Sequence, residues 1–74
     1  MQYSELGKYI KYRRLNLGIS LNKFAIECEL DSAILSRIEN LKQDIKINVL
    51  QKIANGFGDT PAKFLTKFEK EFKK

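Results

Sequence analysis

Apolar residues recur three or four positions apart along most of the chain, and nowhere do apolar and polar residues alternate for long enough to form a strand. Such spacing is typical of amphipathic helices that each turn one face to a common core. The chain has only 74 residues, so its helices must be short and only one compact core can form. The sequence therefore predicts an all-α fold.

Capping and helix-breaking residues divide this pattern into five predicted helices. The helices cover about 4–17, 20–28, 31–39, 47–57 and 60–73. Residues suited to cap their N-termini are Ser4, Ser20, Asp31 and Thr60, the last followed by Pro61. Gly18 and Gly58 are suited to end the first and fourth helices. We expect one domain over 1–74, with a core over 4–66 and a last helix that extends beyond that core.

The inward faces of these helices are predicted from the same spacing. We expect the core to contain Leu6, Ile10, Leu17, Leu21, Phe24, Ala25, Cys28, Ile34, Leu35, Ile38, Leu50, Ile53, Ala54 and Phe57. Cys28 lies on such a face, so we expect a small buried hydrophobe rather than a redox thiol.

The residues that catalysis and metal binding most often need are scarce. The chain has no histidine and one cysteine, which excludes an intramolecular disulfide and leaves few ligands for zinc. The usual general base and the Ser-His and Cys-His nucleophile pairs are also missing. We therefore expect no enzyme, no cofactor and no metal site, and no small-molecule ligand is evident.

Charge and hydropathy narrow the choice of partner. Fourteen Lys and Arg against nine Asp and Glu give a net charge of +5, which favours a polyanion such as nucleic acid. The alternative is that the charge only keeps a small domain in solution. No apolar run approaches the ~20 residues of a membrane span, and the N-terminus does not look like a signal sequence. We expect a cytoplasmic protein with no membrane partner.

The segment 20–40 is the most informative for function. It holds two helices of about two turns joined by a tight turn, which should cross steeply so that the second projects its outer face. A helix presented in this way suits the ~12 Å wide major groove of DNA. Geometry of this kind is a weak indication by itself, because other compact helical proteins also contain tight turns.

The residues of this segment and its surroundings resemble a known family. The segments are Gly18-Ile19-Ser20, Phe24-Ala25, Ile34-Leu35-Ser36-Arg37-Ile38-Glu39-Asn40, Leu50-x-Lys52-Ile53-Ala54, Gly58 and Phe64-Leu65. Together they look like the Xre-type helix-turn-helix family of phage repressors and Cro-like proteins, over about 6–65. The chain departs from the family pattern at three positions: Leu21 replaces a usual Gln, and Glu29 and Leu41 replace glycines after the second and third helices.

The resemblance implies how the third helix would read DNA bases. Its outward N-terminal positions are Ser32, Ala33, Ser36 and Arg37. Arg37 is the one long donor among them and could contact guanine O6 and N7, or a phosphate. The serines can each make a single hydrogen bond, Ala33 can touch a thymine methyl, and DNA shape is expected to add specificity. The alternative for each serine is a plain helix-surface residue.

The resemblance also implies phosphate contacts at the start of the second helix and the end of the third. These positions hold Ser20 with Asn22 or Lys23, and Asn40. Lys42 and Lys46, in the following loop, could flank the same DNA strand. For any one of the lysines, ordinary solvated charge is an equally good interpretation.

An ion pair between the first and third helices is a further implication of the resemblance. Arg14 and Glu39 occupy the positions of a family pair, so we expect a partly buried pair that holds the recognition helix against the scaffold. Arg13 lacks that partner and is expected to be exposed.

An aromatic stripe on the last helix suggests a dimer. Phe64 and Leu65 match the end of the family core, and Phe68 and Phe72 continue the same i, i+4 stripe beyond it. A small monomer has little interior left to cover those rings, so we expect a homodimer interface at Phe68 and Phe72, with Phe64 or Leu65 at its margin. Two recognition helices would then lie about one DNA turn apart. The alternative is that Tyr3 or Tyr9 of the first helix covers these rings within one chain.

Two functions remain open at this point. The first is a sequence-specific regulator of transcription, a repressor or controller, which binds a roughly palindromic operator in double-stranded DNA as a homodimer and is associated with the nucleoid when bound. Its compact size resembles that of phage repressors and restriction–modification controller proteins. The second is a protein-interaction or antitoxin-like module on the same fold with weak DNA binding, which Leu21 and the small recognition face favour.

Overall fold

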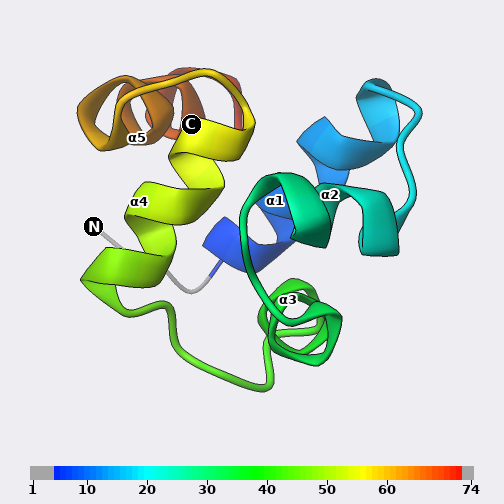
Figure 1. The fold of residues 1–74 in the computed structure, drawn as a ribbon. Helices are drawn as coiled ribbons and strands as arrows, with labels where there is room; N and C mark the ends of the chain where they lie inside the picture. The colour runs from blue at the N-terminus through cyan, green and yellow to red at the C-terminus, as the bar shows by residue number, and fades with distance from the viewer. Residues whose placement is uncertain (1–4, 73–74) are drawn as a thin grey trace.

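The computed structural model of the chain describes residues 5–72 and contains five α-helices in that range (Figure 1). They are α1 (Leu6–Asn16), α2 (Leu21–Glu27), α3 (Ser32–Glu39), α4 (Ile47–Gly56) and α5 (Pro61–Glu71). No strand occurs within the described residues. The predicted all-α fold is confirmed, with each helix slightly shorter than expected from the sequence.

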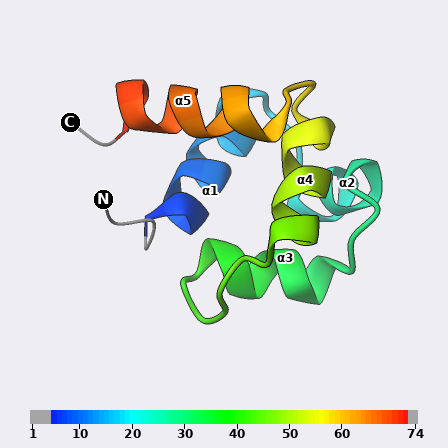
Figure 2. The same cartoon turned by 90° about the vertical axis from the view of Figure 1, so that its left-hand side faces the viewer.

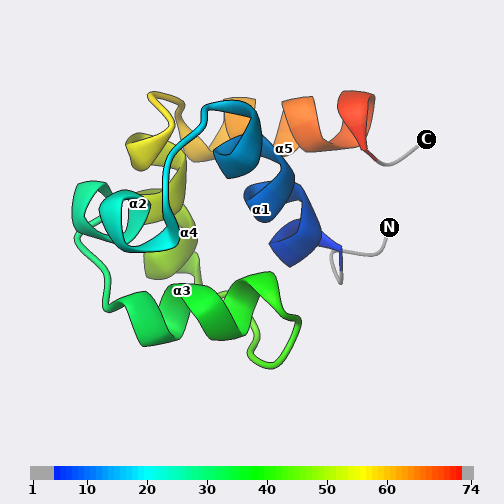
Figure 3. The ribbon, with the colours of Figure 1, turned by 90° about the vertical axis from the view of Figure 1, so that its right-hand side faces the viewer.

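The helices place α3 and α5 on opposite sides of the domain. In Figures 2 and 3, α5 lies along one side, α3 along the other, and α1 and α4 run between them. α3 packs against α1 and α2, and α4 packs against α5. The outer side of α3 therefore faces away from the rest of the molecule, as a recognition helix requires.

Three of the predicted N-caps form side-chain hydrogen bonds to the backbone. Ser20 Oγ accepts from the Lys23 amide at 3.1 Å, Asp31 Oδ1 from the Ala33 amide at 2.8 Å and Thr60 Oγ1 from the Lys63 amide at 3.2 Å. Each bond satisfies an amide that the first helical turn leaves without a partner. Ser4 lies outside the described residues, and α1 begins after Glu5 without a side-chain cap.

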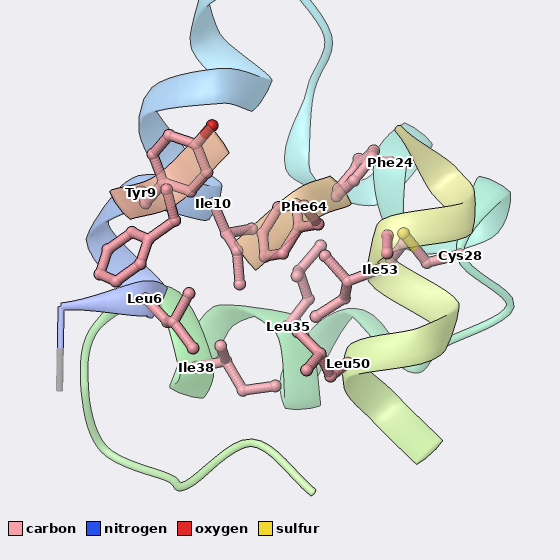
Figure 4. Packing of buried hydrophobic residues seen from close by; sticks show 13 residues of the cluster. Leu6, Tyr9, Ile10, Phe24, Cys28, Leu35, Ile38, Leu50, Ile53 and Phe64 are labelled. Atoms are coloured by element: carbon pink, nitrogen blue, oxygen red, sulfur yellow. The ribbon is translucent and has the colours of Figure 1, made fainter. Parts of the chain in front are cut away.

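The core receives side chains from all five helices (Figure 4). Its buried members are Leu6, Tyr9, Ile10, Phe24, Ala25, Cys28, Leu35, Ile38, Leu50, Ile53, Ala54, Phe64 and Phe68. Leu21, Ile34 and Phe57 pack at its margin. Leu17 is an exception to the predicted core: it is 59% exposed at the C-cap of α1, beyond the part of the helix that packs on the core.

The prediction of an exposed aromatic stripe on α5 is wrong for Phe68 and for Phe64 at its margin. Phe64 and Phe68 are completely buried within one chain, and the Tyr9 ring lies 5.4 Å from each of their ring centroids. Because α1 and α5 are close enough for these rings to meet, the i, i+4 face of α5 closes onto Tyr9. Leu65 and Phe72 are partly buried against the same core. The alternative to a dimer interface was that Tyr3 or Tyr9 of the first helix covers these rings within one chain. Tyr9 does so, and Tyr3 lies outside the described residues.

Arg13 is also more constrained than expected. Its Nη1 donates to Asp59 Oδ2 at 2.8 Å, and its guanidinium lies 4.5 Å from the centroid of the Phe57 ring. The expectation of an exposed Arg13 is therefore wrong: the side chain is 18% exposed and joins α1 to the turn before α5. Stacking on an aromatic face and pairing with a carboxylate are both characteristic of arginine.

Candidate nucleic-acid interface

The four candidate base-contacting residues lie on the outer side of α3. Ala33 and Arg37 are exposed, and Ser32 and Ser36 are partly exposed. Leu35 and Ile38, on the opposite side of the helix, are buried with 0% and 1% exposure. Because the inward pair anchors α3 to the core, the outward four share one accessible face.

A buried ion pair fixes α3 to α1. Arg14 Nε donates to Glu39 Oε2 at 2.8 Å, and Arg14 Nη2 donates to Glu39 Oε1 at 3.0 Å. Both residues are buried, and the hydrogen bonds to Glu39 raise the pKa of Arg14 above its usual value. Arg14 Nη1 also donates to the Ile19 carbonyl, immediately before α2. The structure thus brings together the two residues expected to pair, and the same arginine ties down the start of the helix-turn-helix.

A glycine permits the close approach of α1 and α3. A side chain at Gly7 would overlap the backbone carbonyl oxygen of Ile38 and come within 2.9 Å of a Leu41 methyl. Because this carbonyl belongs to the backbone of α3, making room for a side chain at Gly7 would require α3 to move away from α1. Gly7 therefore sets the distance at which the recognition helix lies on the scaffold.

Both ends of the segment around α3 contain non-glycine residues in the left-handed region. Glu29, after α2, has φ +57°, and Leu41, after α3, has φ +60°. These are the two positions where the resembling family has glycine. The Leu30 amide donates to the Ala25 carbonyl at 2.9 Å and the Lys42 amide to the Arg37 carbonyl at 2.8 Å, as in a Schellman motif. The chain keeps the glycine conformation at both places without the glycine.

The side chain of Arg37 is held by a residue that the sequence did not identify as functional. Arg37 Nε donates to Gln43 Oε1 at 2.8 Å. Gln43 lies in the loop between α3 and α4 and is partly exposed. A glutamine in a polar loop carries no motif or spacing that marks it, so nothing in the sequence could have found this contact.

The candidate phosphate contacts form two separate groups. Ser20, Asn22 and Lys23 are exposed at the start of α2, where the Ser20 hydroxyl accepts the capping bond and keeps its own proton free to donate. Asn40 closes α3, and its Nδ2 donates to the Ser36 carbonyl at 2.9 Å and, at 3.4 Å, to the Ser36 hydroxyl. Because the amide nitrogen carries two N–H groups, a phosphate can take the place of the longer bond while the bond to the carbonyl is kept.

Lys42 and Lys46 are exposed in the loop that follows α3. Within residues 5–72, no hydrogen bond joins the group at α2 to the group after α3.

The thiol of Cys28 is not reactive. Cys28 is 2% exposed, and burial, with a smaller contribution from the nearby Glu27 charge, raises the pKa of its thiol to about 12. A thiol with that pKa is protonated at neutral pH and is a poor nucleophile. In the part of the chain that the structure describes, no three potential metal ligands gather in one place, and no helix has the length and hydropathy to cross a membrane.

Comparison with known proteins agrees with this geometry. The sequence pattern of the family described as "Helix-turn-helix" matches residues 10–65. Control protein C.MunI of a Mycoplasma species is 34% identical over 65 residues, which cover 88% of this chain and 88% of that protein. No solved structure matches the chain significantly.

Proposed function

The chain belongs to the helix-turn-helix family and is a DNA-binding regulator of transcription, and we propose that it recognises a specific operator in double-stranded DNA as a homodimer. The observation that carries the proposal is the rigid attachment of α3. The buried Arg14–Glu39 pair and the close approach at Gly7 hold this helix with its polar face outward. A pre-positioned helix loses little conformational freedom when it enters the major groove.

Arg37 is the principal base-reading residue in this proposal. It is exposed on the outer face of α3, and its length and paired donors suit guanine O6 and N7. Ser32 and Ser36 supply single hydrogen bonds, and Ala33 contacts a thymine methyl. Ser20, Asn22, Lys23, Asn40, Lys42 and Lys46 bind phosphates, which adds affinity without sequence preference.

The homodimer is supported by the relative and by the surface that remains after Phe64 and Phe68 are buried. The relative is called a control protein, and a controller of this size gains specificity by binding two half-sites. Tyr12 is 45% exposed and its ring lies 5.7 Å from that of Phe72, so the two form an accessible aromatic edge beside α5. We place the contact between protomers at this edge, with Leu65 at its margin. Sedimentation as a monomer at micromolar concentration would contradict the dimer.

Because its proposed target is DNA, we also propose that the protein acts in the cytoplasm, at the nucleoid when bound. The competing proposal is a protein-interaction or antitoxin-like module with weak DNA binding. Leu21, which stands where the resembling family has Gln, and the small side chains of Ser32, Ala33 and Ser36 on the outer face of α3 favour it.

A mobility-shift experiment with genomic fragments separates the two proposals. The parent protein should retain fragments that share one sequence. Arg37→Ala should cost about 1–3 kcal/mol on that sequence and relax the preference at one base position. Lys42→Ala should weaken binding to all sequences alike and reduce the salt slope by about one unit.

Lys63→Ala is the matched control, because Lys63 is exposed on α5, on the opposite side of the domain from α3. It should leave both the affinity and the salt slope unchanged. No retained fragment of common sequence would favour the protein-interaction module instead.

A further inference from the structure

We propose that Gln43 is a positioning residue that orients Arg37 for guanine recognition. The inference rests on the proposed function and adds a second specificity-determining residue to it. Its basis is the 2.8 Å hydrogen bond from Arg37 Nε to Gln43 Oε1, which joins the recognition helix to the loop after it.

The geometry of the guanidinium explains why this bond matters. The group is planar with five donors, and Gln43 engages the one at Nε, on the edge nearest the side-chain stem. Among the described residues, no other hydrogen bond or ion pair engages the side chain of Arg37, so both terminal Nη groups stay available. Two terminal donors side by side are what a bidentate contact to guanine O6 and N7 uses.

The loop that carries Gln43 is anchored at both ends. On one side, the Lys42 amide closes the α3 terminus by donating to the Arg37 carbonyl. On the other side, Ile45 packs against the core. Leu41, Gln43 and Ile45 also line a hollow together with Leu6 and Gly7 of α1. Gln43 therefore approaches Arg37 from a held backbone rather than from a free loop.

Fixing an arginine in advance should improve recognition. A free arginine loses several rotatable torsions on binding, which costs up to ~2 kcal/mol of side-chain entropy, and a hydrogen bond at Nε removes part of that loss before DNA arrives. It also restricts Arg37 to the orientations that point along the outer face of α3. Gln43 would thus contribute to base preference without touching a base.

Gln43 could instead act as a DNA contact of its own, since its amide nitrogen remains a donor. The two roles differ in a double-mutant cycle. If Gln43 works through Arg37, its removal has no effect once Arg37 is gone. If Gln43 binds a phosphate directly, its effect is added in full to that of Arg37→Ala and appears on every sequence.

The experiment measures operator affinity and single-base preference for the parent, Gln43→Ala, Arg37→Ala and the double variant. Gln43→Ala should weaken binding to the preferred operator about threefold to tenfold, as expected for one net hydrogen bond. It should relax the same base position as Arg37→Ala, leave the salt slope unchanged, and have no further effect in the Arg37→Ala background.

Two further variants complete the design. Gln51→Ala is the matched control, because Gln51 is an exposed glutamine on α4 and should bind as the parent does. Gln43→Glu keeps an acceptor for Nε but adds a negative charge, so it should retain the base preference while weakening binding to all sequences.

The outcomes decide the proposal. A uniform loss with Gln43→Ala, or full additivity with Arg37→Ala, would overturn the positioning role while leaving the regulator intact. A parent that retains no operator at all would overturn the regulator first, and this result is visible before any variant is made. Circular dichroism of each variant ensures that the loss is not one of folding.

Discussion

Two neighbouring arginines of α1 serve opposite sides of the domain. Arg14 pairs with Glu39 and holds α3, whereas Arg13 pairs with Asp59 and holds the start of α5. The α3 side is bound by one bidentate pair between two buried residues. On the α5 side, Asp59 receives a second bond from Lys67 at 3.0 Å. The Arg13 guanidinium also lies near three aromatic rings, those of Tyr9, Phe57 and Phe64. Beside the packing of its apolar face, α3 is thus held by one ion pair, whereas the start of α5 is held by two ion pairs that share Asp59.

The residues with a left-handed backbone also differ between the turns that flank α3 and the turns after α1 and α4. The turns after α1 and α4 contain Gly18 and Gly58, with φ of +70° and +81°, where glycine adopts the left-handed region freely. The ends that flank α3 place Glu29 and Leu41 in that region, which costs about 1–2 kcal/mol for each L-residue. Backbone strain is therefore concentrated around the recognition helix, as is common at functional sites.

The largest expected effect is from removing one arginine on each side. Arg14→Ala leaves Glu39 buried without its partner and should destabilise the fold by about 3–5 kcal/mol. Arg13→Ala should cost less, because Asp59 keeps Lys67. Urea denaturation of both variants measures the difference. If Arg14→Ala does not fold, Glu39→Gln provides the same test, and equal losses on the two sides would contradict the comparison.

Relief of strain gives the next effect. Glu29→Gly should stabilise the protein by about 1 kcal/mol, because glycine adopts the left-handed conformation without the strain that a side chain causes there. The Glu29 side chain is exposed, so little packing is lost. Gly58→Ala should destabilise by about 1–2 kcal/mol at the corresponding position after α4. Thermal melting checks both. A destabilising Glu29→Gly would show that the turn before α3 is not strained.

The smallest expected effect is a pH dependence on the α5 side. Burial raises the pKa of Asp59, but hydrogen bonds from Arg13 and Lys67 outweigh it and lower the pKa below the usual 3.8. A lowered folded-state pKa means that the stabilisation is complete above pH 3.8 and is lost as pH falls below it. Acid titration of the free energy of unfolding should show this loss, and Asp59→Asn should remove it.

Local features of the fold were predictable because their causes are local. Ser20 and Asp31 cap helices through amides two or three residues away, so the residue type and its position suffice. The Arg14–Glu39 pair spans 25 residues and was expected only from the family resemblance. Glu29 and Leu41 were marked by the same resemblance, as residues that stand where glycine is usual.

The sequence by itself determined the starts of α2, α3 and α5 and which face of α3 is polar, because capping bonds and helical periodicity involve residues within one or two turns of each other. Only the tertiary structure decided that Tyr9 covers Phe64 and Phe68, that Arg13 meets Asp59, and that Gln43 holds Arg37. The first two contacts depend on how α1 and α5 pack, and the third on the path of the loop after α3. The packing of two helices and the path of a loop are not encoded in the spacing of residues along a single helix.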